Sequence, residues 1–155
     1  MDWSSVIALG LSLAASFAAA SPGAIFRPGA WYAGLAKPGW TPPNWAFPVV
    51  WAVLFTAMAV AAWLVWEAQG PAARPVLALY GAHLVVNAAW SWLFFGLRRM
   101  DLALADVALL WAMIAGLIAA FWPISPAAAL LLVPYLVWVT IAAALNLRML
   151  QLNPA

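Results

Sequence analysis

Five long apolar segments constrain the fold of this chain more than any other feature. Each has about twenty residues, the length that an α-helix needs to cross the hydrocarbon core of a bilayer. They cover approximately residues 3–25, 44–67, 76–97, 102–122 and 127–148. We therefore predict an all-α membrane protein, a five-transmembrane-helix bundle that forms a single domain over residues 1–155.

The composition agrees with lipid as the main solvent of this chain. Hydrophobic residues make up 69% and charged residues 6%, whereas a soluble domain has about 25% charged residues. Six basic and four acidic residues provide no basic stripe, so we expect no nucleic-acid partner. The absence of cysteine excludes disulfides, thiolate catalysis and sulfur-ligated metals.

The first apolar segment has some features of a signal peptide, because small residues follow it in AAASPGA. The residues before it include Asp2 but no lysine or arginine, whereas a signal peptide begins with a basic region. We therefore expect the first helix to be retained.

The segment between the first two spans is unusually stiff. The sequence from residue 30 to residue 51 reads AWYAGLAKPGWTPPNWAFPVVW and contains the only lysine, Lys37. Prolines at 38, 42 and 43 fix φ, remove N–H donors and disfavour helix at the residues before them. We predict that residues 26–43 form a rigid aromatic lid without regular helix, and that this lid covers a site.

Basic residues predict the orientation of the bundle in the membrane. If the loops alternate sides, only Arg74 lies on the side opposite the lid. The lid side holds Arg27, Lys37, Arg98, Arg99 and Arg148. The positive-inside rule then places the lid and the C-terminus in the cytoplasm and the N-terminus outside. Helical spans favour a bacterial inner membrane over an outer one, where barrels prevail.

Four tryptophans on four different spans lie at a similar depth beneath the lid. At about 1.5 Å of rise per residue, Trp51, Trp90, Trp111 and Trp138 are about 10–15 Å below its level. Membrane tryptophans ordinarily occupy belts at the two interfaces, so this deeper layer predicts an aromatic cavity.

Polar side chains share the faces that carry two of these tryptophans. Asn87 and His83 lie one and two turns before Trp90, respectively, on one face of the third span, and Tyr135, Trp138 and Ala142 share a face of the fifth. Buried amides and indole N–H groups require partners, and in a membrane they face the bundle interior.

Structural alternatives to a ligand site exist for several of these residues. The tryptophan layer can also serve helix packing alone. We expect His83 to form an interhelical hydrogen bond rather than a metal site, and Asp106 to form an ion pair with Arg98, Arg99 or Arg148. No metal site and no cofactor are expected.

Two other groups also have more than one interpretation. Arg27 and Lys37 can act as topology determinants or receive an anionic ligand at the cavity mouth. Ala78, Gly81 and Ala82 permit close helix approach, and a homodimer through this face is plausible.

Signatures of enzymes are missing from the sequence. It contains no GxSxG, HExxH, phosphate-binding loop or paired-carboxylate pattern. Five spans are few for a transporter built from two repeats, and no internal duplication is visible. The residues themselves thus favour a membrane binding protein and not an enzyme.

Three stretches resemble the TspO/MBR family, whose members are called tryptophan-rich sensory protein in bacteria and translocator protein, or peripheral-type benzodiazepine receptor, in mitochondria. They are WYAGLAKPGWTPPNWAFPVVW, NAAWSWLFFGLRR and VPYLVWVTIAAALNLRMLQLN. The resemblance implies a five-helix bundle, usually dimeric, with a ligand pocket at the lid end. It also implies binding of porphyrins such as protoporphyrin IX and haem, of isoquinoline carboxamides and benzodiazepines, and of cholesterol.

The resemblance assigns pocket positions to residues of this chain. The principal positions are Trp31, Tyr32, Trp51, Asn87, Trp138 and Ala142. Further lining positions are Ala20, Gly23, Phe47, Trp90 and Trp111.

The sequence also departs from the pattern of the family. Trp92 stands where relatives often have proline, so we expect a straighter third span, and His83 replaces a commoner glutamine. Ala142 replaces polar residues, which weakens any role in proton handling. The stretch ALNLRMLQ lacks the aromatic residue of the cholesterol motif, so sterol binding is not expected.

We hypothesise an integral membrane porphyrin- or haem-binding sensor or transport-facilitating protein. The flat ring would stack on Trp51 and Trp138, Asn87 would donate a hydrogen bond, and Arg27 or Lys37 would meet the propionates. One alternative is light- and oxygen-dependent degradation of protoporphyrin, with Trp31, Tyr32 and Trp138 as electron or radical partners. The other is a scaffold without a ligand.

Overall fold

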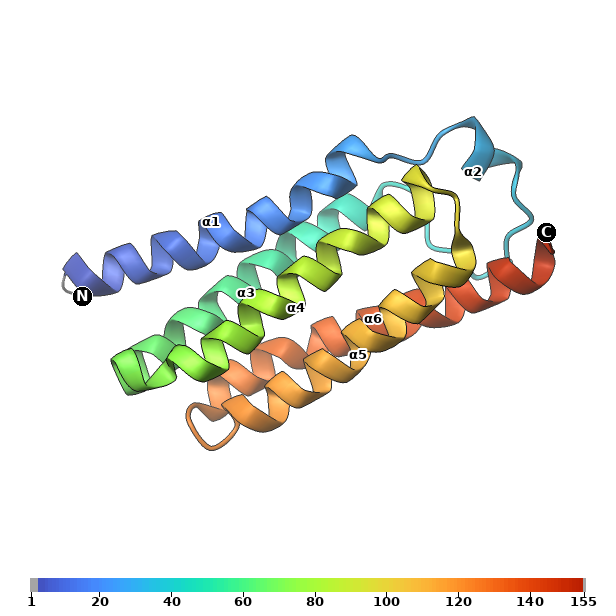
Figure 1. Cartoon of the computed structure of the whole chain (residues 1–155). Helices are drawn as coiled ribbons and strands as arrows, with labels where there is room; N and C mark the ends of the chain where they lie inside the picture. The colour runs from blue at the N-terminus through green and yellow to red at the C-terminus, as the bar shows by residue number, and fades with distance from the viewer. Residues whose placement is uncertain (1–2, 155) are drawn as a thin grey trace.

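Helices make up all the regular structure of residues 3–154, the part of the chain that the computed structural model describes (Figure 1). The α-helices are α1 (Trp3–Ile25), α2 (Ala30–Gly34), α3 (Ala46–Gln69), α4 (Arg74–Ser91), α5 (Met100–Phe121) and α6 (Pro126–Leu152). A 3₁₀ turn, η1 (Gly70–Ala73), precedes α4, and a π-helical segment, η2 (Trp92–Gly96), follows it. Five long helices form the bundle, and the short α2 lies at the end that also holds the C-terminus.

The long helices have the length and composition of membrane spans. Within the described residues, four continuous helical stretches are apolar enough to cross a bilayer: Trp3–Ile25, Ala46–Gly96, Met100–Phe121 and Pro126–Leu152. The second has 51 residues, and it reverses at Gly70, where φ is +54°, so that α3 and α4 run antiparallel. The predicted all-α bundle of five transmembrane helices is confirmed, and the chain is a multi-pass membrane protein.

Prolines lie in the first turns of α4 and α6, whereas the predicted spans began one residue after each of these prolines. Pro75 and Pro126 each occupy one of the first two positions of their helix, where the missing N–H has no intrahelical partner to lose. Ser125 caps α6, because its Oγ accepts a hydrogen bond from the Ala128 N–H at 3.3 Å. These two helices therefore begin slightly before the predicted residues 76 and 127, and α6 continues to Leu152 instead of ending near 148.

The prediction that residues 26–43 contain no helix is wrong for five of them. Residues Ala30–Gly34 form the single turn and a half of α2, which ends at Leu35 in extended conformation. The prolines at 38, 42 and 43 restrict only themselves and the residues before them, so the sequence upstream of Lys37 is free to turn. The rest of the predicted lid has no regular secondary structure.

We expected a straighter third span because Trp92 stands where relatives often have proline, but the last part of this span is not a regular helix. The backbone changes to π-helical geometry over Trp92–Gly96, and Arg98 then adopts a left-handed φ of 56° that ends the span. Gly96 lies where a Cβ atom would come within 3.0 Å of ring atoms of both Phe26 and Trp92. Close packing at this point thus requires the glycine.

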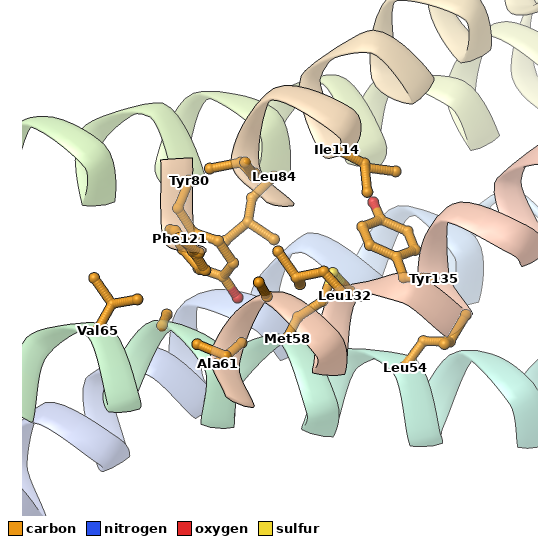
Figure 2. Close-up of a cluster of buried hydrophobic side chains, with 14 of the residues drawn as sticks. Leu54, Met58, Ala61, Val65, Tyr80, Leu84, Ile114, Phe121, Leu132 and Tyr135 are labelled. Carbon is orange, nitrogen blue, oxygen red and sulfur yellow. The ribbon is translucent and has the colours of Figure 1, made fainter. Parts of the chain in front are cut away.

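The main core fills the space between α3, α4, α5 and α6 with apolar side chains (Figure 2). Met58, Val65, Ile114, Phe121 and Leu132 are among its fully buried members. A second, smaller core at the lid end joins the lid to the bundle. Its buried members are Tyr32, Phe94, Met100, Ala103, Leu145 and Met149.

Helix α1 lies at the edge of the bundle and buries polar rather than apolar side chains. Its buried residues are Ser5 and Ser16. The Ser16 hydroxyl lies 2.7 Å from the Tyr80 hydroxyl of α4, and Ser5 Oγ accepts a hydrogen bond from Trp63 Nε1 of α3 at 3.2 Å. Since these groups have no water to bind in a bilayer, such contacts between helices hold α1 in place.

Candidate ligand-binding site

A cavity of about 730 Å³ lies at the lid end of the bundle. All five long helices contribute to its wall, and Tyr32 of α2 closes part of it. Helix α1 packs against α3 and α4, and the lid residues Phe26, Arg27, Pro28 and Tyr32 line the cavity beside the C-terminal end of α1. Its size lies within the range of about 300–1,000 Å³ that is typical of small-molecule sites.

Aromatic rings form much of the wall. Trp51 of α3 packs against Phe55 with ring centroids 5.3 Å apart, and Trp138 of α6 meets Phe47 edge to face at 5.7 Å. On the α4 side, Trp90 stacks on Phe94 at 4.8 Å. In each pair, the two rings hold one another in a fixed orientation. The cavity therefore offers preformed flat apolar surfaces to a ligand.

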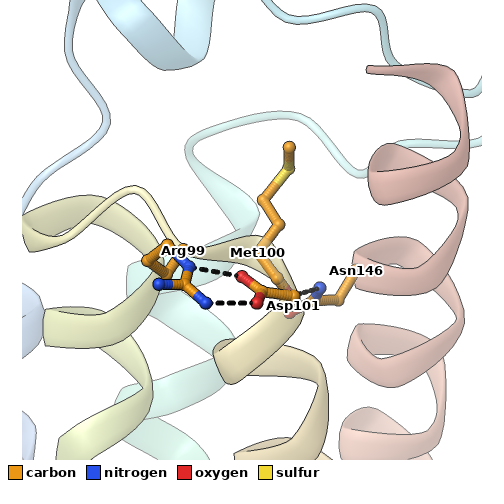
Figure 3. Close-up of polar contacts among 4 residues, drawn as sticks. All are labelled: Arg99, Met100, Asp101 and Asn146. Atoms are coloured by element: carbon orange, nitrogen blue, oxygen red, sulfur yellow. Dashed lines mark hydrogen bonds and ion pairs between the residues drawn. The ribbon is translucent and has the colours of Figure 1, made fainter. Parts of the chain in front are cut away.

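The polar groups in the wall are few and mostly held by other residues. Asn87 Nδ2 donates to the Tyr135 hydroxyl at 2.7 Å, which joins α4 to α6. Asn146 Oδ1 accepts from Trp90 Nε1 at 3.2 Å. Asn146 Nδ2 donates to the Met100 carbonyl at 2.8 Å (Figure 3). Such apolar walls with a few positioned amides are the ordinary chemistry of a small-molecule site.

The comparison with known proteins decides the family. The sequence model of the TspO/MBR family matches residues 5–152, almost the whole chain. The chain belongs to the TspO/MBR family. The resemblance found in the sequence is thus confirmed.

Several curated proteins are similar over most of the chain. The tryptophan-rich sensory protein of Cereibacter sphaeroides is 40% identical over 99% of this chain and 94% of its own length. Protein CrtK of Rhodobacter capsulatus is 41% identical over 88% and 86%, respectively. The human translocator protein is 42% identical over 75% and 70%. Membership in this family gives the chain a membrane sensor or transport-related role.

Most positions selected by the TspO/MBR resemblance lie together in the cavity wall. Trp51, Asn87, Trp90 and Trp138 come from α3, α4 and α6 and face the same space. The other selected residues that line it are Ala20, Gly23, Tyr32, Phe47 and Ala142. Arg27 also lines it, at the end of α1.

Trp111 does not join the layer, contrary to the estimate from depth along the helix. Its side chain is 42% exposed, and its Nε1 donates at 2.8 Å to Thr140 Oγ1 on the outside of α6. The residue count gave its depth, but rotation about the axis of α5 places the indole outside the cavity.

Trp31 also lies outside the cavity wall, although its neighbour Tyr32 is part of it. The Trp31 ring packs edge to face on Phe94 at 5.8 Å, and the Arg98 guanidinium lies 6.0 Å from the ring centroid. Trp31 thus anchors the lid to the smaller core.

Lys37 is occupied by the lid itself. Its Nζ donates to the carbonyl oxygens of Leu35 at 3.1 Å and Ala33 at 3.3 Å and lies 4.5 Å from the centroid of the Tyr32 ring. Burial raises the pKa of the Tyr32 phenol above its ordinary value, so the ring under the ammonium group is neutral. Of the two expected cations, Arg27 alone contributes to the wall.

The expectations for His83 and Asp106 are wrong. His83 Nδ1 bonds the Tyr80 carbonyl of its own helix and not a partner on another, and its Nε2 is buried without a partner. Within the described residues the ion pair present is Arg99–Asp101, at 2.6 Å (Figure 3), and Asp106 Oδ2 has no hydrogen-bond partner. Asp106 therefore does not pair with Arg98, Arg99 or Arg148.

Sequence reasoning missed several wall residues. Phe94 and Phe95 face the cavity because the π-helical turn rotates them there, and no local pattern predicts that turn. Asn146 and Met149, by contrast, continue the face of Tyr135, Trp138 and Ala142 by further helical turns. Extending that face along the helix would have identified both.

Proposed function

We propose that this protein binds a tetrapyrrole, a porphyrin or haem, within its membrane bundle and acts in the sensing or transport of that pigment. The observation that carries the proposal is the cavity of about 730 Å³, whose walls are flat aromatic rings and whose polar groups are few. A porphyrin is a wide, planar, mostly apolar molecule with acidic groups at one edge. Such a ligand matches aromatic walls with a cation at the rim.

The proposed pose uses groups from three helices and from the lid segment that follows α1. The ring lies between Trp51 and Trp138, which face the cavity from α3 and α6. Asn87 has one N–H engaged with Tyr135, and its remaining hydrogen-bonding capacity can serve the pyrrole nitrogens. The propionates point to Arg27 at the end of α1, where a guanidinium can bind a carboxylate with two hydrogen bonds.

Flat aromatic amides would occupy the same cavity for the same reasons. We therefore extend the proposal to ligands of the isoquinoline carboxamide and benzodiazepine type, which would compete with the porphyrin. Competition between the two classes would indicate a shared site.

A titration of the purified protein with protoporphyrin IX tests the proposal. Replacing Trp138 with alanine removes one stacking face, and we expect about tenfold weaker binding, followed through the absorption of the porphyrin itself. Trp122→Ala is the matched control, because Trp122 is 53% exposed at the far end of α5. The affinity of this variant for protoporphyrin IX should equal that of the natural protein. Equal affinities for all three proteins would refute the pose.

The same titration in darkness and under illumination separates binding from photochemistry. Plain binding gives identical, saturable curves in both conditions. Conversion of the porphyrin to a defined product in the light, at a rate above that in detergent alone, would instead support light-dependent degradation.

We also propose that the lid end faces the cytoplasm across the bacterial inner membrane. The segments that carry Arg27, Lys37, Arg98, Arg99 and Arg148 lie at the lid end of the bundle, whereas Arg74 begins α4 directly after η1, at the opposite end (Figure 1). This distribution supports a cytoplasmic lid by the positive-inside rule.

A further inference from the structure

One side chain at the end of the last helix forms hydrogen bonds with the lid. Asn153, at the C-terminal end of α6, forms two hydrogen bonds with the backbone of Ala36. Its Oδ1 accepts from the Ala36 N–H at 2.9 Å, and its Nδ2 donates to the Ala36 carbonyl at 2.9 Å. The side-chain amide thus pairs with a single residue of the lid as a neighbouring strand would.

A third hydrogen bond fixes the amide from its own helix. Asn153 Nδ2 also donates to the Met149 carbonyl at 2.8 Å, and the Asn153 N–H bonds the same carbonyl at 3.1 Å. Both N–H groups and the oxygen of the amide are therefore engaged. Aspartate has the same size, but its carboxylate donates no hydrogen bond to the two carbonyls.

Within the described residues, the two hydrogen bonds between Asn153 and Ala36 connect the lid to a distant part of the chain. Among the described residues, the other hydrogen bonds of residues 26–43 reach no further than four residues along the chain. Beyond them, the lid is held by side-chain packing of Trp31, Tyr32 and Leu35 in the smaller core. Ala36 lies four residues after Tyr32, which closes part of the cavity.

We propose that Asn153 is a positioning residue that keeps the lid closed over the cavity and thereby sets the rate at which ligand enters and leaves. The second half of this statement rests on the proposed function. The first half, that Asn153 closes the lid, stands without any ligand. When the pair with Ala36 separates, packing alone holds Tyr32 over the cavity, and the lid opens more often.

Amide hydrogen exchange of the ligand-free protein tests the closing of the lid. In Asn153→Ala and Asn153→Asp, we expect the amides between residues 31 and 41 to exchange about three- to tenfold faster, as the loss of one or two exposed hydrogen bonds implies. Amides of α3 should keep their natural rates, which shows that the bundle is intact. Gln151→Ala is the control, because Gln151 is exposed and its side-chain amide accepts a hydrogen bond from Arg148 of its own helix. Unchanged lid exchange in both Asn153 variants would overturn the proposal.

Stopped-flow mixing with protoporphyrin IX tests the effect on ligand exchange. Loss of the closing contact should raise the association and dissociation rates together, by about three- to tenfold, while Kd changes little. A general packing defect would instead raise dissociation alone and weaken Kd. Faster lid exchange with unchanged ligand rates would overturn the role in ligand exchange. If the natural protein binds no porphyrin, the proposed function fails, and the hydrogen-exchange result still decides whether Asn153 holds the lid.

Discussion

The hydrogen bond from Asn87 to Tyr135 joins two helices at the cavity wall. Tyr135 is fully buried, and its ring packs edge to face on Trp51, with centroids 6.1 Å apart. Its hydroxyl receives the Asn87 N–H across the interface of α4 and α6 at 2.7 Å. The bond therefore orients a cavity amide and an aromatic wall at once.

Removal of this hydroxyl should destabilise the bundle. In Tyr135→Phe the buried Asn87 N–H loses its acceptor, and we expect the free energy of unfolding to fall by about 1–3 kcal/mol. Thermal unfolding in detergent measures the change. The double variant Tyr135→Phe with Asn87→Leu should lose less than the sum of the two single variants, because no unpaired group remains. Strict additivity would contradict this account.

Arg27 should distinguish porphyrins by their acidic groups. In Arg27→Gln the charge at the cavity rim is lost, and we expect several-fold weaker binding of protoporphyrin IX. Binding of its uncharged dimethyl ester should stay unchanged. Arg74→Gln at the opposite end of the bundle is the control, and equal losses for acid and ester in Arg27→Gln would count against a propionate contact.

At the scale of elements, the π-helical segment shapes one wall of the site. It ends the third span, brings Phe94 and Phe95 to the cavity wall and packs against the segment that follows α1. Gly96 makes this approach possible, because Phe26 occupies the space that a side chain would need.

Gly96→Ala should therefore destabilise the protein although alanine favours helix. The added methyl group would lie 3.0 Å from two aromatic rings, and overpacking of this kind costs about 1–3 kcal/mol. The control is Gly116→Ala in α5, where nothing lies within 4 Å of the added atom and the propensity gain should leave stability equal or higher. Thermal unfolding gives the melting temperature of each variant relative to the natural protein. A melting temperature of Gly96→Ala equal to or above that of the natural protein would show that the rings move aside.

Helix boundaries at this scale follow from proline only in part. The sequence located each break between spans, yet Pro75 and Pro126 lie inside helices because the first turn tolerates them. Pro134 lies within α6, where neighbouring helices can satisfy the freed backbone carbonyl. Proline therefore lies in the first turn of some helices and in the interior of others, so it does not by itself give the residue at which a helix begins.

The orientation of the whole molecule is open to a direct test because the chain contains no cysteine. Gly34→Cys places a thiol on the exposed end of α2, where the added Cβ meets no atom within 4 Å, and Ala72→Cys places one in η1 at the opposite end. A membrane-impermeant thiol reagent should label Ala72→Cys in intact cells and Gly34→Cys only after lysis. The reverse pattern would place the lid outside.

The sequence alone determined the class of this protein, since five apolar segments of spanning length permit little except a helical membrane bundle. It also located the lid segment from its prolines and the family from three characteristic stretches. The tertiary structure decided which side chains face inward. Trp138 lines the cavity whereas Trp111, at a similar depth, packs on the outside with Thr140.

The physical reason is that a residue count fixes height along a helix but not the rotation of that helix against its neighbours. In a membrane the outer face is as apolar as the core, so hydrophobic periodicity gives little information about rotation. Packing between helices sets it, and contacts between residues far apart in the chain, such as Asn153 with Ala36, exist only once that packing is complete.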